Sequence, residues 1–160
     1  DTLFIGQAVE VPGTAMFNTL KDIHPDKRLE LPVFEDTQMG MSIGMSLTGK
    51  RVISIFPRWN FLLCATNQLV SHLDKFPIIT EGDVSPGIII RTSVGSQRPL
   101  FPGHQHIGNM SSAYREMLST VEIIELKEPM DIFPSYQKAY KRDDGKSTLL
   151  VEFGDYYNEK

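Results

Sequence analysis

Apolar and polar positions along the chain follow two alternating periods, which predict strands and helices in turn. Continuous or alternating apolar runs predict strands over residues 29–34, 51–56, 88–92, 121–126 and 148–152. Apolar residues three or four positions apart predict helices over residues 14–23, 36–47, 60–75, 111–119 and 130–140. Strands separated by helices indicate an α/β fold, a three-layer sandwich in which a mainly parallel sheet carries helices on both faces.

Two segments lack either period and are predicted to be loops. Residues 76–86 are rich in Pro, Gly and Asp, which are typical of turns. Residues 93–109 form the longer irregular segment. Because long loops inside a compact domain are usually functional or mobile, residues 93–109 are a candidate part of a binding site.

The helix predicted over residues 36–47 contains two glycines one turn apart, Gly40 and Gly44. It places Met39, Ile43 and Leu47 on one face, which we expect to be buried. A glycine inside a helix costs about 1 kcal/mol relative to alanine. The pair therefore predicts close packing, either against another helix or against a cofactor.

Glu35 lies where the apolar strand predicted over residues 29–34 meets this helix. In open α/β sheets, ligands bind near the carboxyl ends of the strands, so an acid at this junction can be partly buried and face a ligand. Taken alone, a single Glu near a strand end is more often an exposed or helix-capping residue. Both interpretations stay open at this level.

Composition excludes several classes of partner. The 160 residues are enough for one core that buries on the order of 70% of the unfolded surface. The net charge is -4 and there is no basic block, so the electrostatic footprint of a nucleic-acid-binding protein is missing. The longest apolar runs are far shorter than the roughly 20 residues that span a bilayer. We therefore expect neither a nucleic-acid nor a membrane partner.

The single cysteine, Cys64, excludes an internal disulfide and is expected to be a buried structural thiol. This cysteine usage suits a reducing compartment, so we expect an intracellular protein, in the cytoplasm or in a mitochondrial or plastid matrix. The sequence begins at Asp1 without a Met, and a core-like Leu3-Phe4-Ile5 follows closely, which suggests trimming, a tag remnant or processing. No signal-peptide pattern is seen.

Three sequence blocks carry a resemblance to a known family. They are LPVFEDTQMG at residues 31–40, FPRWNF at 56–61 with ATNQ at 65–68, and IIRT at 89–92 followed by GHQH at 103–106. Together they resemble the pyrimidine-binding domain of transketolase-type thiamine-diphosphate enzymes. The likeness is greatest to the beta subunit of the decarboxylase component of 2-oxo acid dehydrogenase complexes, and it extends over residues 4–152.

The blocks also depart from the family pattern. The first block keeps the Pro, the Glu and the final Gly of a Thr-Pro-x-x-Glu-x-Gly-x-x-Gly pattern, but Thr37 replaces its first Gly. Asn67 replaces the Asp of an Ala-x-Asp-Gln helix, and Arg58 stands where a small or apolar residue is usual. The resemblance leaves two expectations for Arg58, which either reads an anionic substrate or pairs with an acid.

The resemblance implies a cofactor, thiamine diphosphate, and residues that touch it. Glu35 would share a proton with the pyrimidine ring nitrogen, so that the aminopyrimidine of the cofactor can act as the base. Phe61 would pack on the aminopyrimidine, and Gly40 would leave room for the cofactor. The alternative for Phe61 and for its neighbour Trp59 is ordinary packing in a core or an interface.

Two histidines of the third block are candidate catalytic residues. The resemblance implies that His106 lines the substrate channel, and His104 stays a second candidate because the spacing after this block is one residue longer than in the family. Histidine can hold a carboxylate or an oxyanion near neutral pH. Two His at i and i+2 could instead suggest a metal site, but no Cys or third His lies nearby in the sequence.

The family holds the diphosphate through Mg²⁺ bound by a Gly-Asp-Gly stretch, which this sequence lacks. The resemblance therefore implies a hetero-oligomer in which an alpha-type subunit or domain supplies the diphosphate and Mg²⁺ half. We expect residues 1–160 to be a single pyrimidine-binding domain without the C-terminal domain that follows in the family. Such a chain is either a fragment or a naturally short subunit, and it would not be active alone.

The implied activity is decarboxylation of a 2-oxo acid. Three alternatives remain at this level. They are a transketolase-like subunit for two-carbon transfer, a non-catalytic assembly or regulatory domain of the same fold, and an α/β binding protein unrelated to thiamine.

Overall fold

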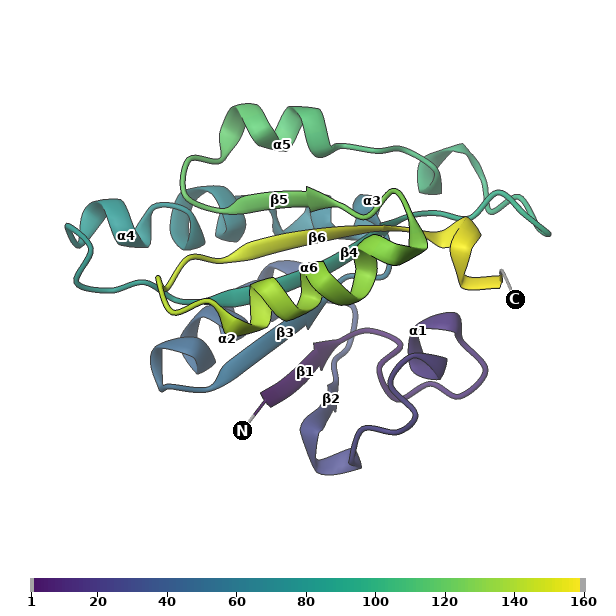
Figure 1. Ribbon diagram of the computed structural model, residues 1–160, viewed down its shortest axis with the longest axis horizontal. Coiled ribbons are helices and arrows are strands. Elements are labelled where there is room, and N and C mark those ends of the chain that lie inside the picture. The colour runs from purple at the N-terminus through teal and green to yellow at the C-terminus, as the bar shows by residue number, and fades with distance from the viewer. Residues whose placement is uncertain (1, 159–160) are drawn as a thin grey trace.

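A computed structural model describes residues 2–158 of the chain. Six strands form one sheet in the order β2-β1-β3-β4-β6-β5, and each neighbouring pair is parallel (Figure 1). The strands are β1 (Thr2–Gly6), β2 (Arg28–Glu30), β3 (Arg51–Ile55), β4 (Ile88–Val94), β5 (Glu122–Glu125) and β6 (Thr148–Phe153). The predicted α/β class and parallel sheet are confirmed.

Helices connect the strands. They are α1 (Ala15–Asn18), α2 (Glu35–Leu47), α3 (Trp59–Leu62), α4 (Phe76–Ile79), α5 (Ser111–Met117) and α6 (Pro129–Lys141). A π-helical segment covers Gln68–Leu73, and short 3₁₀ turns cover Pro25–Lys27, Leu63–Ala65, His104–His106 and Gly154–Asn158. Among the helices in residues 2–158, none is both long and apolar enough to cross a membrane.

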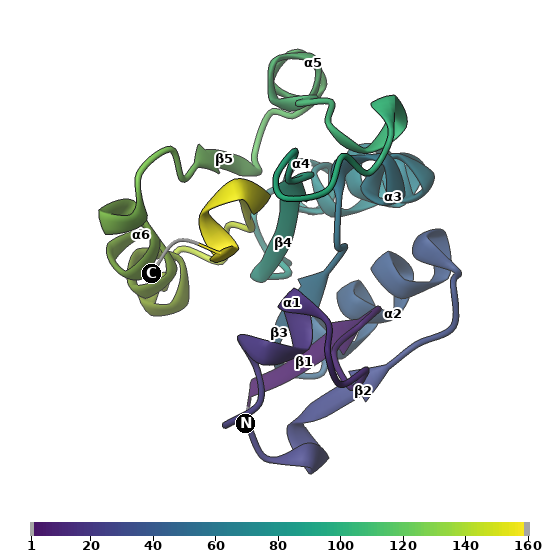
Figure 2. The ribbon, with the colours of Figure 1, turned by 90° about the vertical axis from the view of Figure 1, so that its right-hand side faces the viewer.

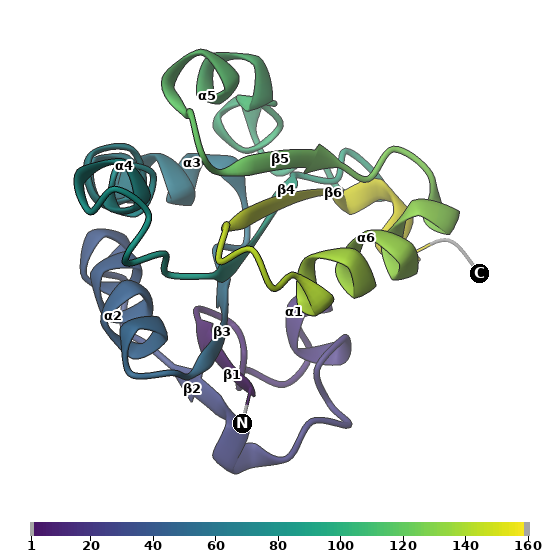
Figure 3. The ribbon, with the colours of Figure 1, turned by 60° about the vertical axis from the view of Figure 1, so that its left-hand side comes forward.

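The helices form one layer on each face of the sheet (Figures 2 and 3). Neighbouring strand residues point to opposite faces, so Val52 and Ile90 belong to the core under α2 and α3, whereas Ile53 and Ile89 belong to the core under α1 and α6. The three-layer sandwich therefore follows from strands that are apolar on both faces, as is usual for buried parallel sheets.

The chain reverses direction across the sheet between β1 and β3. From β1 it moves outward to the edge strand β2, and α2 then carries it back to β3 on the other side of β1. Such a switch point opens a crevice at the carboxyl ends of the strands. Gly6 ends β1 here with φ +152°, and a Cβ at this position would lie 2.1 Å from the carbonyl oxygen of Ile55. Only glycine fits at this point.

Several predicted boundaries are wrong. Residues 31–34 lie outside β2, because Pro32 cannot donate to the sheet. The N–H of Leu31 still bonds to the carbonyl of Gly6, whereas that of Phe34 bonds locally to the carbonyl of Pro32. The helix predicted over residues 14–23 is only one turn, Ala15–Asn18. Residues 76–86 contain the short helix α4.

The helix predicted over residues 60–75 is divided into α3, a 3₁₀ turn and the π-helical segment. Near the division, the Thr66 hydroxyl donates to the carbonyl of Leu63 at 2.6 Å, a side-chain bond that competes with regular helix geometry. Cys64 is exposed, so the expectation of a buried thiol is wrong.

The remaining predicted elements lie within two residues of their expected ends. β1 is a further strand that the periodicity did not predict.

Candidate functional site

Glu35 is the first residue of α2 and is only 6% exposed. Its Oε1 accepts a hydrogen bond of 3.0 Å from the side-chain amide of Gln7, which directly follows β1 and is itself buried. Among residues 2–158, Glu35 Oε2 has no hydrogen-bond partner. The interpretation of Glu35 as an exposed acid is therefore wrong. The site has a buried carboxylate with one oxygen held and the other available.

A buried glutamine fixes α2 to the sheet beside this carboxylate. Gln38 Nε2 donates to the carbonyl of Ile55 at 2.9 Å and to the hydroxyl of Ser54 at 3.2 Å. Because Ile55 ends β3 and faces Gly6, these bonds attach α2 at the switch point. Sequence reasoning missed Gln7 and Gln38. The one signal for Gln7 was its place just after an apolar segment that ends in Gly6.

Exposed apolar side chains precede the buried acid. Val33 is 68% exposed and Phe34 is 63% exposed. Large apolar side chains that stay exposed next to one another often mark a contact with another protein. Glu35 therefore lies at the border between a buried polar network and an uncovered apolar surface.

The rings of His106 and Phe61 lie next to each other. His106 is half-buried, its ring lies 5.8 Å from the ring of Phe61, and its Nδ1 is 2.9 Å from Asn60 Oδ1. The carbonyl of His106 accepts a bond of 3.0 Å from the N–H of Gly95, just after β4. A Cβ on Gly95 would lie 2.3 Å from that oxygen, so the close approach of the loop needs glycine.

His104 lies in a different environment. It is exposed, and its ring packs edge-on against Phe101 at 5.1 Å. Of the two candidate histidines, the structure places only His106 against Phe61. Among residues 2–158 there is no group of three or more His, Cys, Asp or Glu side chains that could hold a metal ion.

The two glycines of α2 do not pack closely against another helix in residues 2–158. A Cβ on Gly40 would meet only the side chain of Gln68, at 3.8 Å, which is an ordinary contact. A Cβ on Gly44 would meet nothing within 4 Å. Packing against a cofactor stays a prediction. Leu47 is also 45% exposed, whereas Met39 and Ile43 are buried as predicted.

A cavity of about 330 Å³ opens at the carboxyl ends of β1, β3, β4 and β6, and we call it the strand-end cavity. Phe61 and Arg58 line it, whereas Glu35, His104 and His106 do not. The other residues around it are Ala8, Thr14, Ala15, Met16, Pro57, Ser93, Gly95, Ser96, Gly154 and Tyr157. Trp59, between Arg58 and Phe61 in the sequence, is 1% exposed and belongs to the core.

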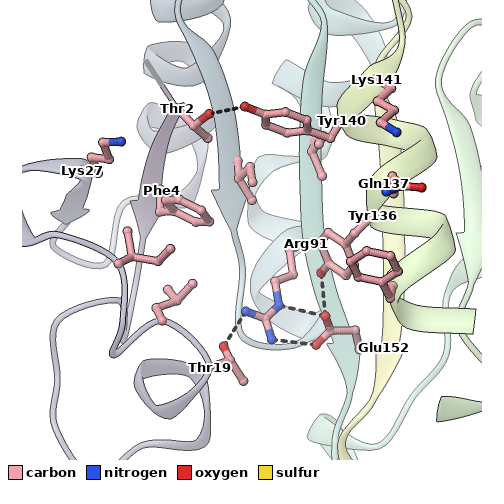
Figure 4. Close-up of a pocket in the computed structure, with 15 residues that line it drawn as sticks. Thr2, Phe4, Thr19, Lys27, Arg91, Tyr136, Gln137, Tyr140, Lys141 and Glu152 are labelled. Carbon is pink, nitrogen blue, oxygen red and sulfur yellow. Dashed lines mark hydrogen bonds and ion pairs between the residues drawn. The ribbon is translucent and has the colours of Figure 1, made fainter. Parts of the chain in front are cut away.

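A larger groove, of about 610 Å³, lies between α6 and the segment around α1, and we call it the α1/α6 groove (Figure 4). Within it, Arg91 Nε and Nη2 each donate to the carboxylate of Glu152 at 2.9 Å, and Nη1 donates to the Thr19 hydroxyl at 2.8 Å. Burial opposes the charged form of Arg91, yet its pKa lies above the ordinary value because Tyr136 and Glu152 face it. Arg91 therefore forms a structural ion pair with Glu152.

The fold is that of transketolase-type thiamine-diphosphate enzymes. A solved split-gene transketolase, described as an inactive beta4 tetramer, superposes with a TM-score of 0.71 over 95% of this chain and 45% of its own, at 11% identity. Benzoylformate decarboxylase from Polynucleobacter necessarius superposes with a TM-score of 0.64 over 99% of this chain and 28% of its own, at 17% identity. Identities this low show the fold alone.

Sequence comparison finds relatives of higher identity than these two solved structures. The chain is 28% identical over 148 residues to the pyruvate dehydrogenase E1 component subunit beta of Gracilaria tenuistipitata var. liui, and 29% identical over 146 residues to that of Porphyra purpurea. It spans 44% and 43% of their lengths, so less than half of each relative is represented. No family model matches the chain. The resemblance to a transketolase-type pyrimidine-binding domain of the E1 beta kind is confirmed.

Proposed function

We propose that this chain is the pyrimidine-binding half of a thiamine-diphosphate-dependent enzyme that decarboxylates a 2-oxo acid. The observation that carries the proposal is the buried carboxylate of Glu35 at the switch point, with Oε1 held by Gln7 and Oε2 without a partner among residues 2–158. The similarity to pyruvate dehydrogenase E1 beta subunits supports the same assignment.

The residues present fit the pyrimidine end of the cofactor. An acid whose second oxygen has no protein partner can share a proton with a ring nitrogen, and the amide of Gln7 fixes how the carboxylate is turned. Phe61 would pack on the aminopyrimidine. Gly40 is the other predicted cofactor contact, and an added Cβ there would make only an ordinary contact with Gln68. When bound, thiamine diphosphate supplies the electron sink that decarboxylation needs.

His106 is the better placed of the two candidate histidines. When Asn60 Oδ1 accepts from Nδ1–H, the neutral ring presents Nε2 as an acceptor, and protonation turns Nε2 into a donor for a carboxylate or an oxyanion. We propose that His106 holds the substrate in this way. His104, exposed beside Phe101, is the second candidate.

The sequence lacks the Gly-Asp-Gly stretch, and residues 2–158 contain no group of three or more His, Cys, Asp or Glu side chains that could hold Mg²⁺. We therefore propose that an alpha-type subunit or domain supplies the metal ligands and the diphosphate site, and that residues 1–160 act as one pyrimidine-binding domain. The exposed Val33 and Phe34, next to Glu35, would be covered by this partner. A site divided between two chains explains why we expect no turnover from this chain alone.

A second candidate is a non-catalytic assembly or regulatory domain of the same fold. Thr37 and Asn67, which differ from the family pattern, favour this candidate. Both residues are exposed, so the packing of the core does not explain why they differ. A transketolase-like two-carbon transfer remains the alternative reaction, since a split-gene transketolase shares the fold.

The test is co-purification of the chain with its alpha-type partner, followed by calorimetric titration with thiamine diphosphate and Mg²⁺ and by turnover assays. We expect Glu35→Gln to lose at least about 100-fold in turnover with the assembly intact, since general acid–base groups contribute about 10²–10⁴-fold. The matched control is Asp36→Asn, which removes the same charge at an exposed neighbouring position.

Equal turnover in Glu35→Gln and wild type would exclude the role of Glu35. An assembly that forms but neither binds the cofactor nor turns over would favour the non-catalytic candidate.

A further inference from the structure

Arg58 has no partner among the residues that the structure describes. Its side chain makes neither a hydrogen bond nor an ion pair within residues 2–158, although it is half-buried. Arginine side chains that are partly desolvated usually pair with an acid, since leaving water is costly for a charge. The expectation that Arg58 simply pairs with an acid of this chain therefore finds no support in residues 2–158.

The strand-end cavity offers Arg58 no opposite charge. Arg58 is the one charged residue among those that line it in the described part of the chain. The hydroxyls of the lining side chains already have partners: Thr14 donates to the carbonyl of Val11 at 2.9 Å, Ser93 to that of Pro57 at 2.7 Å, Ser96 to Asp155 at 2.8 Å, and Tyr157 to Glu152. Among the described residues, the guanidinium of Arg58 is thus the side-chain polar group of this lining without a partner.

The backbone around Arg58 positions its side chain at the cavity. Arg58 follows β3 and its carbonyl accepts from the N–H groups of Phe61 and Leu62, at 3.0 and 3.2 Å, which fixes the start of α3. The stem of Arg58 passes Gly95, where an added Cβ would lie 3.5 Å from Arg58 Cδ. The stem of Arg58 therefore lies beside the end of β4, in the cavity that Phe61 also lines.

We propose that Arg58 makes the strand-end cavity a subsite for an anionic group of the substrate, so that the enzyme takes substrates bearing a second carboxylate or a phosphate ester. Guanidinium binds either oxyanion through paired N–H···O bonds. The volume of about 330 Å³ admits a small group and lies at the low end of ligand pockets. The substrate part of this inference rests on the proposed function.

The first experiment needs neither partner nor cofactor. The Nε–Hε resonance of Arg58 and the amides of Gly95 and Ser96 are followed by NMR while the chain is titrated with malonate or, separately, with inorganic phosphate at constant ionic strength. We expect saturable shifts in wild type, an apparent Kd raised at least tenfold in Arg58→Met, and an intermediate value in Arg58→Lys. Arg98→Met, at an exposed arginine outside the cavity, is the matched control and should bind as wild type does.

Tighter binding of malonate would assign the subsite to a carboxylate, and tighter binding of phosphate would assign it to a phosphate ester. Shifts that do not saturate, or that persist unchanged in Arg58→Met, would overturn the inference.

The second experiment uses the assembled enzyme with 2-oxoglutarate and its matched monoacid, 2-oxopentanoate. We expect Arg58→Met to raise KM for 2-oxoglutarate at least tenfold, with kcat within about threefold of wild type and little change for the monoacid. If phosphate was the tighter probe, a phosphorylated ketose replaces the diacid and its unphosphorylated ketose replaces the monoacid.

Equal effects of Arg58→Met on the charged and uncharged substrates would exclude the specificity role. Competition between malonate and thiamine diphosphate for the subsite would assign it to the cofactor and overturn the substrate role. Failure of the proposed function appears instead as an assembly that does not bind thiamine diphosphate, so the two failures can be told apart.

Discussion

Arg91 in β4 and Arg58, which follows the neighbouring strand β3, have opposite surroundings. In the α1/α6 groove, Arg91 is held by both oxygens of Glu152 and by Thr19, and the hydroxyls of Tyr136 and Tyr157 also bond to Glu152 (Figure 4). In the strand-end cavity, Arg58 has no such partner in residues 2–158. Arg91 is thus a satisfied charge and Arg58 an available one.

Replacing each arginine by methionine should separate the two roles most clearly. Arg91→Met leaves Glu152 as a buried unpaired charge and should lower the free energy of unfolding by about 3–5 kcal/mol. Arg58→Met breaks no bond and should change it by less than about 0.5 kcal/mol. Urea unfolding at pH 7 measures both values. Similar losses in the two variants would contradict the distinction between a structural and an available arginine.

Asp74 tests whether buried partners also satisfy a carboxylate when most of those partners are backbone N–H groups. Asp74 is fully buried and accepts N–H bonds from Ser119, Thr120 and Val121. Burial raises the pKa of Asp74, but the bonds from Lys75 and from these backbone groups lower it below the ordinary value. The ionised form is therefore the one that the fold stabilises.

The pH dependence follows from that direction. A carboxyl whose pKa is lower in the folded state stabilises the fold fully above its unfolded pKa, about 3.9, and loses this contribution as pH falls through the folded pKa. Asp74→Asn should be less stable than wild type by about 2 kcal/mol at pH 7, with the gap narrowing below pH 4. Urea unfolding of both proteins from pH 7 to pH 3 measures it. A gap independent of pH would show that the charge of Asp74 is unimportant.

Two glycine-to-alanine changes test how tightly the strand-end region is built. Gly95→Ala would force Cβ against the carbonyl of His106, and we expect a loss of about 1–3 kcal/mol and an altered His106 environment. Gly44→Ala, in an open helical position, should instead stabilise the chain by up to about 1 kcal/mol. Thermal unfolding and the His106 NMR resonances measure both. A neutral Gly95→Ala would mean that the loop is not held against β4.

The sequence predicted the layer order of the fold but not its details around the site. Continuous apolar strands separated by helices were enough to predict a parallel three-layer sandwich. The junction drew attention to Glu35, and the family resemblance selected it as the candidate acid. The helix predicted over residues 60–75 was divided in the structure because local side-chain bonds such as that of Thr66 compete with regular turns. The strand predicted over residues 29–34 was cut short by Pro32 at a sheet edge.

The local pattern of apolar, glycine and proline residues determined by itself most of the strands and helices and the position of Glu35 at the start of a helix, since these depend on neighbours in the chain. The tertiary structure alone decided which charges are satisfied. Gln7 reaches Glu35 across 28 positions, and Glu152 reaches Arg91 across 61. Arg58 and Arg91 are the same residue type, and only the packing of distant segments gives Arg91 a partner and leaves Arg58 without one in residues 2–158.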